Sequence, residues 1–306
     1  MNGLWGPVLT AMATPFDDDD HVDTVGASKL CRHLLAHGTD GLVVCGTTGE
    51  GAVLTTDERL ALWDACLDSV GDSAAVWAST GTYDTAATVR LSRAAAERGV
   101  HGLLVVTPYY NKPPQEALYR HFAMVAEATD LPIMLYNVPS RTAVNMAADT
   151  TLRLAQDVPT VAAIKEANAD MGQVADLLAG RPTGFRVMSG EDAATFSMVA
   201  MGADGVVSVA SHVVGRQIGE MVAALRAGDL PAASRLHLAT LPVARALFAT
   251  TSPILLKAAL TLLGLPAGRP RLPLIAADEA QVRSLRAALV RAGVLDQAGT
   301  AAAPAS

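Results

Sequence analysis

Short runs of apolar residues recur along the chain, and nearly every run precedes a segment whose apolar residues lie three or four positions apart. Short continuous apolar runs are typical of strands in a parallel sheet that is buried on both faces, and the second spacing is typical of amphipathic helices. The pattern predicts strands at 7–12, 41–45, 74–79, 101–106, 132–136, 160–165, 185–189 and 204–209.

The segments that follow these runs are predicted to be helical. The first seven cover 24–37, 55–70, 84–98, 115–128, 148–156, 171–178 and 191–201. At the start of the second, Thr55 is followed three positions later by Glu58, which is the signature of a capping box. Beyond residue 209 the pattern is only helical, over roughly 212–228, 231–248, 252–264 and 276–292.

Alternation of strands and helices predicts the α/β class, and eight such units predict a closed (β/α)8 TIM barrel. The main alternative is an open, doubly wound sheet, which needs a glycine-rich phosphate-binding turn after its first strand. Here that turn reads Thr14-Pro15-Phe16-Asp17 and contains no glycine. We therefore predict a barrel over residues 1–229, a C-terminal helical region over 230–295 and a disordered tail over 296–306.

Composition and charge limit the classes of binding partner and the cell compartment expected for the protein. The net charge is -7 and there is no run rich in lysine or arginine, which argues against a nucleic-acid partner. Residues 1–16 carry no charged side chain, but their prolines and glycines fit neither a membrane span nor a signal peptide. Cys31, Cys45 and Cys66 show no metal-ligand spacing, and we interpret them as reduced packing residues of a cytoplasmic protein. No zinc or magnesium motif is present.

Lys165 is the first candidate for chemistry. It is one of only four lysines, and it ends the apolar run 161–164. A lysine amine titrates near ~10.4, so only on the order of one in a few thousand is neutral at pH 7. Apolar surroundings favour the neutral form, which is the nucleophile that forms a Schiff base. The alternative is a lysine that extends from a strand end toward solvent.

Other unusual residues follow the strands at the carboxyl ends, where TIM-barrel active sites lie. The segment Gly46-Thr47-Thr48-Gly49-Glu50 follows the second strand, and its backbone N–H groups could face a carboxylate, although an ordinary turn is equally compatible. Tyr109 and Tyr110 lie in a proline-rich loop after the fourth strand. Adjacent tyrosines at such a place are expected to be interface residues or proton donors.

Tyr136 ends the fifth strand, one strand away from Lys165, so it could exchange a proton with an adduct on that amine. Arg141, in the loop that follows, offers a planar fork for a carboxylate, with a structural salt bridge as the alternative. After the seventh strand, Gly190 leaves the backbone bare for a ligand. Lys257 is the only other lysine in apolar company; it is placed on a helix far from the strand ends and assigned to packing or a helix–helix salt bridge.

Five segments together resemble the dihydrodipicolinate synthase family, within the superfamily of class I pyruvate-dependent aldolases and N-acetylneuraminate lyases. They are Gly46-Thr47-Thr48-Gly49-Glu50, Thr107-Pro108-Tyr109-Tyr110, Tyr136-Asn137-Val138-Pro139-Ser140-Arg141-Thr142, Ile164-Lys165-Glu166 and Ser189-Gly190-Glu191-Asp192. The resemblance runs in order from Gly6 to about Ala292. It implies condensation of pyruvate with L-aspartate 4-semialdehyde to 4-hydroxy-tetrahydrodipicolinate, in lysine and diaminopimelate biosynthesis.

The resemblance also implies roles for single residues. Lys165 matches the lysine that forms the Schiff base with pyruvate, and Tyr136, Thr47 and Tyr110 match a proton relay. Thr48 matches the threonine that holds the pyruvate carboxylate, Arg141 the arginine that binds the second substrate's carboxylate, and Gly190 and Val207 the backbone lining of the pyruvate pocket. Tyr109 matches a residue that reaches into the neighbouring subunit. The family uses no metal or other cofactor and is a homotetramer of two tight dimers.

Two departures from the family pattern change the expectations. Lys165-Glu166 is followed by Ala167-Asn168-Ala169-Asp170, where many members have Thr or Ser and Gly, and this weakens the substrate assignment slightly. Ala87 replaces a glutamate that would bind the ammonium of an inhibitory lysine. We therefore predict weak or absent feedback inhibition by lysine.

Two alternative functions remain at this stage. One is another enzyme of the superfamily, an aldolase, lyase or dehydratase that acts on a sugar acid; Arg141 argues against it, because such enzymes usually lack arginine in that loop. The other is a non-catalytic barrel that binds a metabolite. The set Lys165, Tyr136, Thr47 and Tyr110 argues against that, because a pure binder does not need a neutral lysine.

Overall fold

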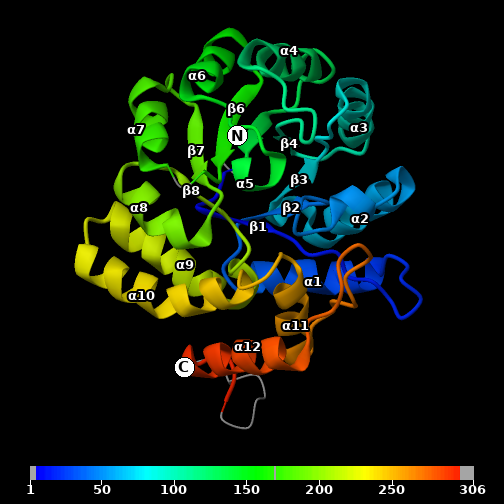
Figure 1. Cartoon of the computed structure of the whole chain (residues 1–306), viewed down its shortest axis with the longest axis vertical. Helices are drawn as coiled ribbons and strands as arrows, with labels where there is room; N and C mark the ends of the chain where they lie inside the picture. Colours follow the sequence, from blue (N-terminus) through cyan, green and yellow to red (C-terminus); the bar gives the residue numbers. More distant parts are fainter. Residues whose placement is uncertain (1–4, 169, 297–306) are drawn as a thin grey trace.

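The computed structural model describes residues 5–168 and 170–296, and within them eight parallel strands close into one barrel (Figure 1). Each strand pairs with the next along the chain, and the last pairs with the first. The strands are β1 (Val8–Ala11), β2 (Gly41–Val44), β3 (Ala75–Ser79), β4 (Gly102–Val106), β5 (Ile133–Asn137), β6 (Val161–Glu166), β7 (Arg186–Ser189) and β8 (Gly205–Ser208). The predicted (β/α)8 barrel is confirmed.

Helices follow the strands and surround the barrel (Figure 1). They are α1 (Thr24–Ala36), α2 (Thr56–Val70), α3 (Thr85–Glu97), α4 (Gln115–Ala126), α5 (Pro139–Thr142), α6 (Ala148–Asp157), α7 (Met171–Gly180), α8 (Thr195–Ala200), α9 (Ser211–Arg226), α10 (Leu230–Leu247), α11 (Ile254–Leu262) and α12 (Glu279–Arg291). The predicted capping box at the start of α2 is present, with Thr55 and Glu58 each bonding to the other's backbone.

The strands are almost entirely buried, because helices cover their outer face and side chains fill the interior. The core is mainly aliphatic. Cys31, Cys45 and Cys66 lie inside it as free thiols, as the sequence analysis predicted. Burial raises the pKa of the Cys45 thiol to about 12, so this side chain stays protonated and behaves as a small apolar group.

Two of the differences from the prediction lie directly after β5 and β7. The loop after β5 contains an extra helical turn, α5, which ends at Ala143 in the left-handed region. The segment predicted as one helix over 191–201 begins instead with a 3₁₀ turn before α8. The reason is that the Asp192 carboxylate accepts hydrogen bonds from the Val209 and Ala210 amides. These bonds tie Asp192 to the segment after β8.

One pair of neighbouring strands in the barrel is joined over only a short length. The pairing between β7 and β8 covers only Met188 with Gly205 and Ser189 with Val206. Carboxylates reinforce it at both ends. Asp204 accepts a hydrogen bond from the Val187 amide at 2.9 Å, and Asp192 accepts one from the Ser208 hydroxyl at 2.5 Å.

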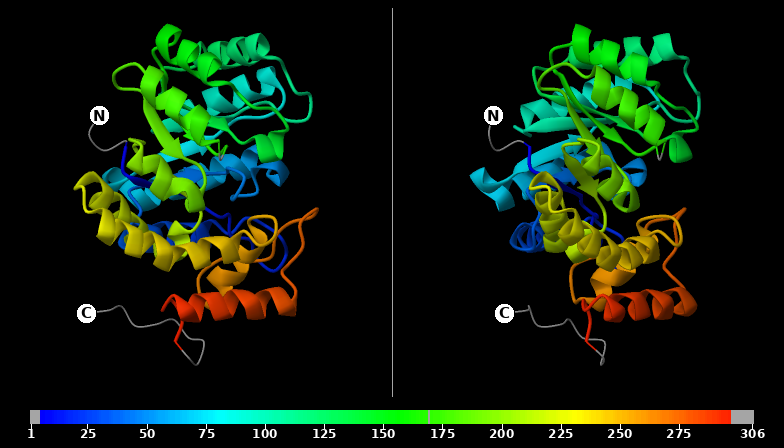
Figure 2. Two further views of the ribbon diagram at one scale, coloured as in Figure 1. Left: turned by 60° about the vertical axis from the view of Figure 1, so that its left-hand side comes forward. Right: turned by 90° about the vertical axis from the view of Figure 1, so that its left-hand side faces the viewer.

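The C-terminal helices lie outside the ring. α10 packs along α9, and α12 packs on α10 and α11, so that α12 is the outermost of the three in both views of Figure 2. α10 begins at Leu230, where the predicted C-terminal region starts, but the division into regions remains a prediction. Residues 297–306 of the predicted disordered tail lie outside the described residues. In the described part of the chain, no helix combines the length and the apolar character needed to cross a bilayer.

Candidate active site

Lys165 and Tyr136 face each other at the carboxyl ends of neighbouring strands. The two residues are directly paired in the register between β5 and β6. The Lys165 amine lies 4.3 Å from the centre of the Tyr136 ring, and both side chains are buried. An ammonium in this position is attracted by the ring face. The predicted proximity of a strand-end lysine and tyrosine is confirmed.

The next residue on each strand faces the opposite side of the sheet, because side chains alternate along a strand. Glu166 accepts hydrogen bonds from the Asn137 side-chain amide at 3.0 and 3.1 Å and from the Gln173 amide of α7 at 2.9 Å. Glu166 is completely buried, and burial raises the pKa of its carboxyl group. The Asn137–Glu166 contact fixes the register that places Tyr136 beside Lys165.

Gly190 lies against the lysine side chain. A Cβ atom at this position would be 3.0 Å from Cγ of Lys165 and 2.7 Å from Cβ of Ala167, so only glycine leaves the space open. Burial raises the pKa values of the Glu191 and Asp192 carboxyls, and the positive charge of Lys165 opposes that shift in both. Both carboxyl groups therefore lie close enough to Lys165 for their charges to interact.

The turn after β2 is fixed from within. The Glu50 amide donates to the Thr47 carbonyl at 3.1 Å, and the Gly51 amide donates to the Gly46 carbonyl at 3.0 Å. A Cβ atom at Gly51 would be 2.1 Å from the Cys45 carbonyl oxygen, so this close approach requires glycine. The turn is therefore tightly packed, with Thr48 buried and Thr47 exposed toward a cavity.

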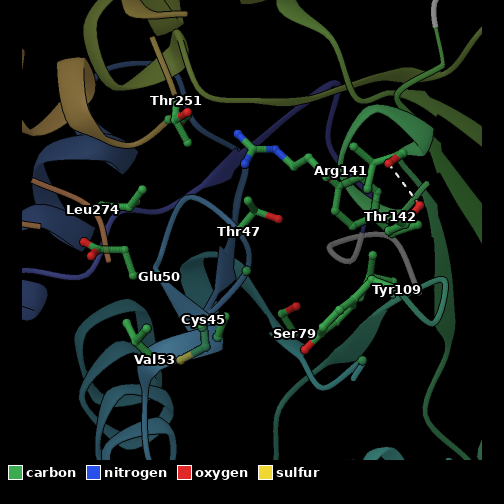
Figure 3. A pocket seen from close by; sticks show the side chains of 18 of the residues that line it. Cys45, Thr47, Glu50, Val53, Ser79, Tyr109, Arg141, Thr142, Thr251 and Leu274 are labelled. Atoms are coloured by element: carbon green, nitrogen blue, oxygen red, sulfur yellow. Dashed lines mark hydrogen bonds between the residues drawn. The ribbon is translucent and has the colours of Figure 1, made fainter. Parts of the chain in front are cut away.

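That cavity opens beside the strand ends and is shown in Figure 3. Thr47, Tyr136, Tyr109 and Arg141 all line it. Arg141 projects from α5 into the space between Thr47 and Thr251 (Figure 3). Among the described residues its guanidinium has no carboxylate partner, so the structural salt bridge considered as an alternative is not found there.

The other predicted site residues do not form this wall. Lys165, Thr48 and Val207 are buried, with exposed fractions of 5%, 4% and 1%. Lys165 does not line the cavity, but it contacts Tyr136, which does. Gly190 lies next to Lys165, as described above. Within the described residues, no three His, Cys, Asp or Glu side chains are grouped so as to hold a metal ion.

The two adjacent tyrosines occupy different environments. Tyr109 is half-buried in the cavity wall, and its ring makes an edge-to-face contact with Tyr83 at a centroid distance of 5.5 Å. Burial raises the pKa of the Tyr109 hydroxyl. Tyr110 has φ of +73° and is 90% exposed. In its own chain, therefore, Tyr110 does not join Thr47 and Tyr136.

Several residues of the cavity were not among the predicted site residues. Arg59, on α2, is buried in the wall and donates to the Ser79 carbonyl at 3.1 Å. Thr251, Ser252, Arg271, Pro273 and Leu274 come from the C-terminal region, more than a hundred residues away from most of the predicted motifs. An isolated arginine or serine carries no recognisable pattern, so local sequence gave no signal for them.

The assignment of Lys257 was wrong in one respect. Its ammonium lies 2.6 Å from Oε1 of Glu50, in the turn after β2. It therefore forms a salt bridge with a strand-end loop, and not with another helix far from the strand ends. The prediction failed because the contact joins residues 50 and 257, a separation at which sequence patterns give no distance information.

Comparisons with known proteins identify the family of the chain. A model of the Dihydrodipicolinate synthetase family matches residues 5–292. The chain belongs to this family. The 4-hydroxy-tetrahydrodipicolinate synthase of Symbiobacterium thermophilum is 56% identical over 291 residues, which cover 95% of this chain and 99% of the relative. The synthase of Moorella thermoacetica is 49% identical with the same coverage.

Solved structures of family members are also similar to this one. The dihydrodipicolinate synthase of Cyanidioschyzon merolae, determined with lysine bound, superposes with a TM-score of 0.93 at 39% identity. The match covers 95% of this chain and 99% of the Cyanidioschyzon merolae chain. The family resemblance inferred from the five sequence segments is confirmed.

Proposed function

We propose that the protein is a 4-hydroxy-tetrahydrodipicolinate synthase, which condenses pyruvate with L-aspartate 4-semialdehyde in lysine and diaminopimelate biosynthesis. The observation that carries the proposal is the contact between the Lys165 amine and Tyr136 at the barrel mouth. A lysine beside a potential proton donor is the arrangement that class I aldol chemistry needs. The names of the similar proteins agree with this activity.

The reaction begins when the neutral Lys165 amine adds to the C2 carbonyl of pyruvate. Loss of water gives a protonated imine, which withdraws electrons and lets the pyruvate methyl group lose a proton. The resulting enamine attacks the aldehyde carbon of the second substrate and forms the new carbon–carbon bond. The substrate's own amine then attacks the imine carbon, closes the ring and displaces Lys165, which returns to its starting state.

The surrounding residues supply proton transfer and binding. Tyr136, with Thr47, moves protons at the adduct. Thr48 holds the pyruvate carboxylate, and the backbone at Gly190 and Val207 forms the rest of the pyruvate pocket. Arg141 binds the carboxylate of the semialdehyde, which its unpaired guanidinium in the cavity supports. This chemistry uses the covalent imine on Lys165 and no separate cofactor.

A second copy of the chain completes the relay. Tyr110 is 90% exposed, and tyrosine is a residue type enriched in interfaces between proteins. We place Tyr110 in the relay of the neighbouring subunit, with Tyr109 in the wall of its own cavity. This replaces the expectation that Tyr109 reaches into the neighbouring subunit, because the role is now assigned to Tyr110. The assembly is a homotetramer of two such dimers. The three free cysteines of each chain suit the cytoplasm.

Reduction with borohydride in the presence of pyruvate tests the mechanism. A pyruvyl mass addition is expected on the peptide that carries Lys165 and is expected to disappear in Lys165→Ala. Steady-state rates with L-aspartate 4-semialdehyde and with sugar-acid substrates then separate the synthase from other members of the superfamily. Absence of the pyruvyl adduct from the parent protein would contradict the proposal.

A further inference from the structure

Glu50 ends the turn that carries Thr47 and Thr48, and its backbone is unusual. It has φ of +54° and ψ of +31°, which is the left-handed region that residues with a Cβ rarely adopt. Its side chain is only 5% exposed, although it lies in the wall of the cavity. A non-glycine residue keeps such a conformation only where its surroundings hold it.

Both oxygens of the Glu50 carboxylate are held by the C-terminal region. The Lys257 ammonium of α11 lies 2.6 Å from Oε1, with both side chains 2% exposed. The backbone amide of Arg271 donates to Oε2 at 2.8 Å. Lys257 is itself fixed, because it donates to the Arg269 carbonyl at 3.1 Å and lies 4.0 Å above the Phe16 ring.

The neighbourhood of this pair carries further charges. The Arg271 side chain forms an ion pair with Glu58 on α2, and Asp20 is close enough to Lys257 and Arg271 to affect the pKa of each. With both of its oxygens occupied, Glu50 is not available to bind substrate. Its contacts join the turn after β2 to α11 and the segment that follows it.

A buried ion pair of this kind is a weak source of stability, because removing two charges from water costs about as much as their attraction returns. Its specific contribution is geometry. One hydrogen bond from the Arg271 amide and one close contact with the Lys257 ammonium fix the position of the Glu50 carboxylate. The Glu50 amide is in turn bonded to the Thr47 carbonyl. The cavity wall continues from this turn through Thr251, Ser252 and Leu274.

We propose that Glu50 is a positioning residue, whose buried pair with Lys257 lets the C-terminal helical region hold the turn that presents Thr47 and Thr48 to pyruvate. The inference rests on the proposed roles of these two threonines. It gives α11 a part in substrate binding that is independent of any contact between subunits.

The test removes the pair without leaving a lone charge. In the double variant Glu50→Gln/Lys257→Met, the melting temperature is expected to stay close to the parent value. The pyruvate concentration that gives half-maximal borohydride trapping on Lys165 is expected to rise about tenfold, together with KM for pyruvate. KM for the semialdehyde is expected to change less, because Arg141 is carried by α5 and not by this turn.

A matched control is the exposed pair formed by Asp64 and Arg98, whose residues do not line the cavity. The variant Asp64→Asn/Arg98→Met is expected to have parental trapping and parental KM values. A folded Glu50→Gln/Lys257→Met protein with parental pyruvate trapping would overturn the inference. Failure of the parent itself to trap pyruvate would instead contradict the proposed function.

If the double variant does not fold, Glu50→Gln alone replaces it. This variant leaves no fixed lone charge, because burial lowers the pKa of Lys257 and the amine can lose its proton. Glutamine keeps the size of the side chain and an acceptor for the Arg271 amide, and the trapping curve is measured in the cold where circular dichroism shows a folded protein. The same rise in the pyruvate requirement is expected. A Glu50→Gln protein that is unfolded even then would show that the pair serves the fold itself, which would also overturn the positioning role.

Discussion

The Lys165 amine lies 4.3 Å from the centre of the Tyr136 ring, across one step of the ladder between β5 and β6. Tyr136→Phe keeps this ring and removes only the hydroxyl. We expect kcat to fall by about 10²- to 10⁴-fold, the range for loss of a proton-transfer group. Trapping of pyruvate on Lys165 should persist, and mass spectrometry of the reduced peptide measures it. Parental kcat in Tyr136→Phe would remove the tyrosine from the relay.

Arg141 is expected to act on the second substrate alone. Arg141→Ala should raise KM for the semialdehyde by about 10- to 100-fold, because a charge-assisted contact with its carboxylate is lost. Arg141→Lys should recover only part of this, since lysine cannot form the two-pronged contact. KM for pyruvate serves as the internal control and should stay constant. An equal rise in both KM values would point to a general loss of cavity shape.

The place of Tyr110 can be tested by mixing subunits. Tyr110→Phe and Lys165→Ala are each expected to be nearly inactive. If Tyr110 serves the neighbouring site, a hybrid dimer has one site with both an intact Lys165 and an intact Tyr110, so the mixed and reassembled proteins should regain activity. Tyr136→Phe mixed with Lys165→Ala is the control. Tyr136 and Lys165 of one chain lie in the same site, so no hybrid site has both intact and no activity should return. Absence of recovery in the first mixture would place Tyr110 outside the neighbouring site.

The Glu58–Arg271 pair predicts a specific acid response. The Arg271 hydrogen bond lowers the pKa of Glu58 from 4.5 to about 2. The folded pKa is therefore below the unfolded one, so the stabilisation is present above pH 4.5 and is lost as the pH falls toward 2. Glu58→Gln should lower the free energy of unfolding by about 1–2 kcal/mol at pH 7, with the difference disappearing in acid. Urea titrations at neutral and acid pH measure this.

A buried histidine predicts a second pH effect with a different window. The Ala13 amide donates to Nε2 of His212 at 3.1 Å, and the other ring nitrogen contacts the Val209 carbonyl at 2.8 Å. Burial lowers the pKa of His212 from 6.5 to about 4. The unfolded chain binds the proton first, so stability should fall as the pH drops from 6.5 toward 4. His212→Gln should flatten this part of the curve; an unchanged slope would contradict the assignment.

Feedback inhibition is expected to be weak. Ala87, on α3, has no group that could bind an ammonium, where lysine-inhibited members of the family are expected to have glutamate. Titration of the activity with L-lysine measures this, and Ala87→Glu is the matched variant that should increase sensitivity. Strong inhibition of the parent at sub-millimolar lysine would show that the prediction is wrong.

The barrel could be predicted because each buried strand is a short apolar run in the sequence. Each helix has apolar residues spaced three or four positions apart. The same runs located the strand ends, and therefore Lys165 and Tyr136. The short helix α5 was missed because Pro139 to Thr142 is only one turn long and has no period to detect. The Glu50–Lys257 pair was missed because its partners meet only after the C-terminal region folds back on the barrel.

The exposure of Tyr110 was also beyond the sequence. Two identical neighbouring residues have no pattern that separates them, and their environments differ here because Tyr110 takes a left-handed backbone conformation. The roles assigned to individual site residues remain predictions, and the experiments above decide them.

The short pairing between β7 and β8 has a consequence for how this ring comes apart. Only two residue pairs join these strands in register, which is fewer than join any other neighbours among the described strands. Amide protons of β7 and β8 should therefore exchange with solvent earlier than those of β5 and β6. Asp204 and Asp192 hold the two ends of this pairing through hydrogen bonds from Val187 and Ser208, and Asp192 lies only two residues after Gly190, the glycine beside Lys165.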